Sequence, residues 1–178
     1  MSAVYRVRQF ARAAGAWLRL GAEGREQSDS PALDRYLPAA GVALFRLMPA
    51  YDRAHARAVF DSLRQAGHVE PDLLAAALLH DAGKTAHPRG RLSLWHRVAA
   101  VLLRAWRPEL LARVGQEGAG GWRRPFFVQA HHAELSAELA RQAGCSDRTV
   151  ALIRYHEDAP GAEDDPLLAA LQAADSKN

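Results

Sequence analysis

Six side chains that can bind metal ions are spread along the sequence at positions that point toward the interior of the predicted fold. Imidazole and carboxylate groups suit Fe, Mn, Co, Ni or Zn, and no thiolate narrows the choice. Because Cys145 is the one cysteine, the chain can build neither an intrachain disulfide nor a cysteine-based zinc site. The candidates are four histidines and two aspartates: His55, His80, Asp81, His132, His156 and Asp175.

The segment LLAAALLHDAGKT, residues 73–85, places two of these candidates after a run of apolar residues. An aspartate is almost never fully buried unless it is paired or binds a metal. His80 and Asp81 therefore lie either where the chain reaches the surface or where something inside the fold satisfies both side chains.

The remaining candidates fall on faces that helical spacing assigns to the interior, because residues three, four and seven apart share a face. His55 faces away from a charged stripe on residues 51–67. His132 points inward with neighbouring leucines, whereas His131 leans outward. His156 and Asp175 each share a face with two apolar residues.

Each candidate alone has an ordinary structural interpretation, since an inward histidine is more often a hydrogen-bonded core residue. Burying all six without strong partners is hard to reconcile with a total stability of about 5–15 kcal/mol. A catalytic ion must also keep positions open for water and substrate. Six ligands are therefore better divided between two ions, with Asp81 bridging them.

The elements that must position these residues are helices. Sustained alternation is absent and Ala and Leu dominate, so we predict an all-α fold, a single helical bundle with the metal site in its core. Prolines mark expected helix starts and glycines mark expected helix ends. The predicted helices cover residues 3–20, 31–48, 51–66, 72–82, 92–105, 108–115, 125–143, 147–157 and 166–176.

Composition excludes several classes of protein. The 178 residues suit one domain, and 49% hydrophobic residues argue against disorder. No apolar stretch reaches about 18 residues, so we expect no membrane span. The basic N-terminal stretch lacks the uncharged centre of a signal peptide, and we expect a cytoplasmic location. The net charge of +3 is interpreted as solvated surface or as a basic patch that attracts an anionic substrate.

The order of the motifs resembles the HD superfamily of metal-dependent phosphohydrolases, whose pattern is H…HD…H…H…D. LLAAALLHDAGKT resembles its apolar helix ending in HD-x-GK, and HHAELSAELA resembles its helix with a histidine four residues before a small residue. ALIRYHE and LQAADSKN resemble the segments with the fourth histidine and the last aspartate. YHEDAPGAEDDP lacks the second histidine and the GYP element of the HD-GYP branch, so the chain resembles a small stand-alone HD protein.

The resemblance covers residues 50–178 and implies an HD-type helical bundle. We expect residues 1–49 to form an N-terminal helical extension packed on that core. In mononuclear members the implied ligands are the first histidine, the HD pair and the last aspartate. In dinuclear members Asp81 bridges, and His132 and His156 hold the second ion. The implied cofactor is a divalent transition metal, with two ions of Mn or Fe expected before Co, Ni or Zn.

The resemblance also implies hydrolysis of a phosphate ester or anhydride in a nucleotide or other small phosphorylated metabolite. Asp81 and Lys84 are the predicted catalytic residues, with Lys84 stabilising phosphoryl oxygens. Lys84 is alternatively a surface lysine at a helix end. The flanking loops supply basic residues that could grip phosphates. The substrate-binding candidates are Lys84, His87, Arg89, Arg91, Arg123 and Arg124.

Two other functions compete with this one. A non-catalytic HD module could bind a nucleotide or a partner protein, but a pure binding role would not require all six candidates. A nucleic-acid binder could use the arginine-rich N-terminus, and its affinity would fall steeply with salt. No recognised nucleic-acid motif is present, so nucleic acid is not an expected partner.

Overall fold

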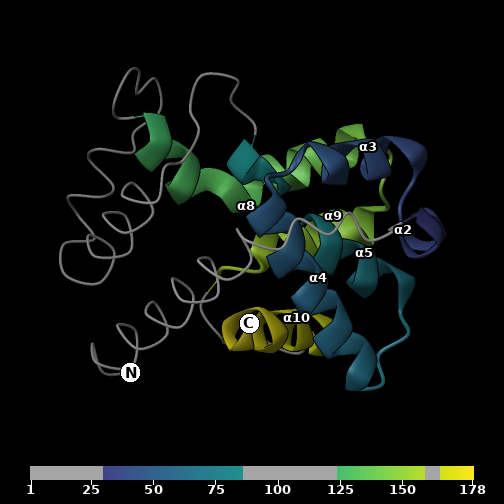
Figure 1. The fold of residues 1–178 in the computed structure, drawn as a ribbon. Helices are drawn as coiled ribbons and strands as arrows, with labels where there is room; N and C mark the ends of the chain where they lie inside the picture. The colour runs from purple at the N-terminus through teal and green to yellow at the C-terminus, as the bar shows by residue number, and fades with distance from the viewer. Residues whose placement is uncertain (1–29, 86–123, 159–164) are drawn as a thin grey trace. The chain divides into compact units, whose positions relative to one another are not determined.

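The computed structural model describes residues 30–85, 124–158 and 165–178. The chain divides into two compact units, Met1–Ser30 and Pro31–Asn178, and the second unit contains all six candidate ligands. Every element assigned within the described ranges is helical, which confirms the predicted all-α fold (Figure 1). These elements are α2 (Ser30–Tyr36), α3 (Ala39–Leu47), α4 (Ala50–Gln65), α5 (Pro71–Leu79), the 3₁₀ helix η1 (Ala82–Thr85), α8 (Arg124–Gln142), α9 (Asp147–Tyr155) and α10 (Pro166–Lys177).

Local chemistry sets the helix boundaries. Pro71 and Pro166 stand in the first turns of α5 and α10, where the amide that proline lacks would have no intrahelical partner. Gly67 and Gly144 follow α4 and α8 with φ of 93° and 81°, a left-handed conformation that glycine adopts without strain. Ser146 accepts from the Thr149 amide and so caps α9.

The prediction of one helix over residues 31–48 is wrong. Two helices, α2 and α3, occupy this segment, and Pro38 stands between them as the N-cap of α3 with ψ of 158°. A proline ring clashes with the preceding helical turn and removes a backbone donor, so the chain restarts its helix there. Similarly, the helix predicted over 72–82 ends at Leu79 and tightens into η1. The helices predicted over 3–20, 92–105 and 108–115 lie outside the described residues.

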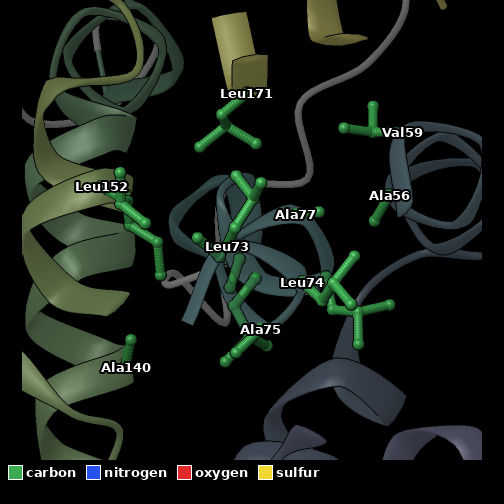
Figure 2. Packing of buried hydrophobic residues seen from close by; sticks show 14 of the residues in the cluster. Ala56, Val59, Leu73, Leu74, Ala75, Ala77, Ala140, Leu152 and Leu171 are labelled. Carbon is green, nitrogen blue, oxygen red and sulfur yellow. The ribbon is translucent and has the colours of Figure 1, made fainter. Parts of the chain in front are cut away.

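Helix α5 is the centre of the hydrophobic core, because every residue from Leu73 to Leu79 is buried. Figure 2 shows side chains of α5 in the middle of the cluster, with residues of α4 on one side and residues of α8 and α9 on the other. A helix that is apolar all round belongs inside a fold. The chain therefore does not surface before His80, and α5 delivers the HD pair into the interior.

Helix α2 joins the same core through Leu33 and helix α3 joins it through Phe45, and Leu37 between the two helices is also part of it. The core thus includes residues that precede position 50, and the domain division predicted between residues 49 and 50 stays a prediction. Within the described part of the chain, none of the helices has the length and apolarity needed to cross a membrane.

Candidate metal centre

The HD pair lies in the interior directly after α5. His80 is 0% exposed and Asp81 is 2% exposed, so both polar groups are cut off from bulk water. His80 is the C-cap of α5, and the next two residues lead into η1. Burial of this kind is sustainable only where other groups compensate both side chains.

Three buried histidines are oriented by the same local contact. In each, Nδ1 donates to the carbonyl oxygen three residues earlier in the chain. The distances are 2.9 Å from His80 to Ala77, 3.0 Å from His132 to Gln129 and 2.6 Å from His156 to Ile153. Because a carbonyl can only accept, Nδ1 carries a proton in each ring, and Nε2 is the nitrogen that faces the interior of the site. Metal-binding histidines are commonly fixed in this way.

One group of ligand atoms gathers around Asp175, which α10 supplies. His55 of α4 donates from Nε2 to Asp175 Oδ1 at 2.9 Å, and His80 Nε2 lies 3.4 Å from the same oxygen. His80 Nε2 is also 3.7 Å from Asp81 Oδ2. His55, His80 and Asp175 each present a ligand atom, and all three atoms lie within 4.8 Å of one another.

A second group gathers on the other oxygen of Asp81. His132 Nε2, from α8, lies 3.5 Å from Asp81 Oδ1. The His156 ring, at the end of α9, is 5.5 Å from the His132 ring and 5.1 Å from the His80 ring between centroids. His80, Asp81 and His156 likewise offer ligand atoms within 4.8 Å of one another. Asp81 Oδ2 thus faces His80 and Asp81 Oδ1 faces His132, while His80 belongs to both sets of three ligand atoms.

These residues fit a divalent ion. His80 Nε2 is buried and has no hydrogen-bond partner, although two carboxylates flank it. Two ligands about 2.0–2.2 Å from one ion, at angles of about 90–110°, lie about 2.8–3.6 Å apart. Four separations in the cluster, 2.9, 3.4, 3.5 and 3.7 Å, match that range to within 0.1 Å, and the fifth, 3.9 Å from His55 Nε2 to Asp81 Oδ2, exceeds it by 0.3 Å.

The electrostatics of the cluster also favour added positive charge. Burial opposes ionisation of Asp81, yet Lys84 and His80 hold the pKa of its carboxyl well below the usual range. The pKa of Asp175 is lowered too, because hydrogen bonding from His55 and the charge of His80 outweigh burial. Burial disfavours charged His80, but the charges of Asp81 and Asp175 raise its pKa to about 9. In the absence of metal, the proton on His80 supplies positive charge beside the carboxylates of Asp81 and Asp175. A divalent ion bound to these residues would replace that proton and supply the positive charge instead.

The histidines on the other side of Asp81 behave differently. Burial, aided by the nearby charge of Lys84, lowers the pKa of His132 to about 4. Burial and the charge of His80 lower the pKa of His156. His132 is therefore neutral at pH 7 and presents a lone pair at Nε2, the form in which histidine binds metals.

A close approach between η1 and α8 sets the position of His132. The Gly83 amide donates to Ser136 Oγ at 2.7 Å. A β-carbon at Gly83 would lie 2.4 Å from the His132 carbonyl oxygen and 2.6 Å from the Ser136 amide nitrogen. Only glycine lets the backbones come this near. The small residue four positions after His132 thus anchors α8 to the HD segment.

The structure brings together all six residues proposed as ligands, from five different elements. Lys84 lies beside them, with Nζ 2.6 Å from Asp81 Oδ2. His131 is exposed on α8, as its outward prediction requires. Four of the substrate-binding candidates, His87, Arg89, Arg91 and Arg123, lie outside the described residues, and Arg124 is described only as the first residue of α8.

Sequence reasoning missed Glu157. Its Oε1 lies 3.6 Å from His132 Nε2, the nitrogen that also faces Asp81. The signal was its position directly after His156 in the segment ALIRYHE. Helical spacing did not reveal it, because α9 ends at Tyr155 and Glu157 lies beyond the regular helix.

A comparison with protein families places this arrangement among known folds. Neither a comparison with curated proteins nor one with solved structures found a match to the chain. The family model of the HD domain matches residues 53–177, a span that contains all six clustered residues. HD domains are helical, bind divalent metals and are generally metal-dependent hydrolases. The chain belongs to the HD domain family.

Proposed function

We propose that this chain is a dinuclear metal-dependent phosphohydrolase. Its substrate class is a phosphate ester or anhydride of a nucleotide or another small phosphorylated metabolite. The observation that supports this most is the convergence of imidazole and carboxylate groups from five elements around the buried Asp81. A non-catalytic module would have no need for two such groups of ligand atoms in its interior.

In this proposal His55, His80 and Asp175 hold one ion, His132 and His156 hold the other, and Asp81 bridges them. When bound, the two ions act as Lewis acids toward phosphoryl oxygen and lower the pKa of water near neutrality. The three contacts from Nδ1 to backbone carbonyls keep the rings in place throughout. Residues 50–178 carry this chemistry, and residues 1–49 contribute none of the proposed ligands.

Lys84 has a separate role. Its ammonium group lies 2.6 Å from Asp81 Oδ2 and its side chain is 15% exposed, so it sits between the buried ligands and solvent. From there it can add positive charge where phosphoryl oxygens gain negative charge in the transition state. His87, Arg89, Arg91, Arg123 and Arg124 remain proposed contacts to the rest of the substrate.

The experiment begins with elemental analysis of protein purified without chelator, which should show one to two transition ions per chain. Nucleotides, dinucleotides and sugar phosphates are then screened for phosphate release with Mn or Fe added. Asp81→Ala should lose both metal and turnover while the circular dichroism of its helices persists. Asp61→Ala, an exposed aspartate of α4, is the matched control and should behave as the parent.

Two outcomes would contradict the proposal. A folded, metal-free parent with no hydrolytic activity in the screen would favour a binding module. An Asp81→Ala variant that hydrolyses substrate at the parent rate would remove Asp81 from the mechanism.

A further inference from the structure

We propose that Glu157 is a ligand of the ion held by His132, so that this side of the site has two carboxylates, Asp81 and Glu157. This inference rests on the proposed function, because it concerns the second of its two ions.

The geometry around His132 Nε2 carries the inference. Asp81 Oδ1 lies 3.5 Å from this nitrogen and Glu157 Oε1 lies 3.6 Å from it. Both separations exceed the 2.7–3.2 Å typical of N–H···O hydrogen bonds. Both separations lie at the upper end of the range of about 2.8–3.6 Å that is expected between two ligand atoms of one ion.

The hydrogen-bonding roles of these atoms point the same way. His132 is 1% exposed, and its Nδ1 donates to the Gln129 carbonyl at 3.0 Å. Nε2 is then a lone-pair atom facing two carboxylate oxygens, which are also acceptors. A cation bound to this nitrogen and to both oxygens would stabilise all three electron-rich atoms. A mixed set of nitrogen and carboxylate ligands is one that Mn and Fe accept.

The position of Glu157 explains why it reaches this nitrogen. His156 ends α9 as its C-cap in a right-handed helical conformation, and its Nδ1 is fixed to the Ile153 carbonyl at 2.6 Å. Glu157 is the next residue, and its side chain is 25% exposed, compared with 3% for that of Asp81. Glu157 is thus the solvent-facing carboxylate at this ion, and Asp81 is the buried one.

The test compares the parent with Glu157→Gln, which keeps the shape and removes the charge, and with Glu157→Asp, which keeps the charge on a shorter side chain. Glu138→Gln is the matched control, because its carboxylate is bound by Arg141 on the exposed side of α8. Mn²⁺ is titrated into each metal-free protein by equilibrium dialysis with elemental analysis. Electron paramagnetic resonance reports whether the bound ions form a coupled pair.

The parent and Glu138→Gln should bind two Mn²⁺ ions with a coupled-pair signal. Glu157→Gln should keep the first ion and bind the second at least about 10-fold more weakly, with an isolated-ion signal. Glu157→Asp should lie between these two. Thermal unfolding of the metal-free proteins should be the same for all four, because the effect acts through the ion.

Several results would overturn the inference. Two ions bound to Glu157→Gln with parent affinity would exclude Glu157 as a ligand and leave the proposed function intact. A parent that binds only one ion would overturn this inference together with the dinuclear part of the proposed function. A parent that binds none would remove the proposed function together with this inference. A metal-free Glu157→Gln that unfolds earlier, with Glu157→Asp affected equally, would assign Glu157 a structural role instead.

Discussion

Replacing Gly83 with alanine tests how the fold positions the site. The added β-carbon would lie 2.4 Å from the His132 carbonyl oxygen, 2.6 Å from the Ser136 amide nitrogen and 2.8 Å from Leu135 Cβ. Ordinary contacts begin near 3.4 Å, so α8 must move away from η1 by about 1 Å. None of these three neighbours is the end of a flexible side chain that could turn aside.

The cost has two parts. Overpacking in a buried contact costs about 1–3 kcal/mol. Separating Gly83 from Ser136 also weakens a buried hydrogen bond of 2.7 Å, which contributes about 1 kcal/mol. The reduced freedom of alanine in the unfolded chain returns about 0.4–1 kcal/mol. The free energy of unfolding should therefore fall by about 1–4 kcal/mol, out of a total of about 5–15 kcal/mol.

The displacement should also reach the metal centre, because α8 carries His132. A shift of about 1 Å moves Nε2 away from Asp81 Oδ1, from which it lies 3.5 Å in the parent. Misplacement by this amount can lower a rate about 100-fold. We expect weaker binding of the second Mn²⁺ ion and a turnover reduced by about that factor.

Gly144→Ala is the control that separates local displacement from general loss of stability. Gly144 has φ of 81° and nothing within 4 Å of an added β-carbon, so its substitution strains the backbone and displaces no neighbour. A left-handed alanine costs about 1–2 kcal/mol. Urea unfolding of metal-free protein should therefore show losses in both variants, whereas Mn²⁺ titration should show weaker binding only in Gly83→Ala. A Gly83→Ala protein with parent stability and parent Mn²⁺ affinity would refute this account of the η1–α8 contact.

Three further predictions concern stability. Removing metal from the loaded protein with a chelator should lower the midpoint of thermal unfolding, because a free ion at 100 times its Kd stabilises the folded state by about 2.7 kcal/mol. An unchanged midpoint, measured by circular dichroism, would speak against a metal centre. Ser146→Ala should lower the free energy of unfolding in urea by about 1 kcal/mol, because Ser146 caps α9 and also donates to Asp72 of α5 at 2.5 Å. A loss below about 0.5 kcal/mol, the lower end of the range for replacing a cap by alanine, would show that the cap is dispensable. Asp165→Asn keeps an N-cap for α10 but removes the pairing with Arg148 at 2.6 Å, which lowers the pKa of Asp165. A carboxyl group whose pKa is lowered by folding stabilises the folded state above about pH 4, and this stabilisation is lost as pH falls through the folded-state pKa. The free energy of unfolding in urea should therefore be higher for the parent than for the variant at pH 7, and the two values should approach each other near about pH 3. A difference in this free energy that does not change with pH would contradict the prediction.

Helical periodicity predicted a large part of the site because it is a local property. The inward faces of His55 and His132 follow from residues within one or two turns, and the structure buries His132 while leaving its neighbour His131 exposed. The apolar run before His80 likewise predicted a helix, and its central position in the core follows from being apolar all round.

Features that depend on contacts between distant elements were not predictable in this way. The break at Pro38 could have been foreseen from proline geometry, but the apolar pattern across it continues and concealed it. The contact of Gly83 with Ser136 joins residues 53 positions apart, so spacing along one helix carries no trace of it. The sequence did not predict Glu157 as a site residue for the same reason, because its partner His132 belongs to another helix.

The anchoring of three imidazole rings to carbonyls of their own helical turns has a consequence for which element the protein carries. Since backbone atoms hold these rings, the coordinating cage exists as soon as the chain has folded. If the chain binds the proposed ions, a preformed set of nitrogen and carboxylate ligands leaves the choice among first-row cations to geometry, ligand type and metal availability. Under the proposed function, protein made in manganese-rich medium and protein made in iron-rich medium should therefore differ in the metal they contain and not in their fold.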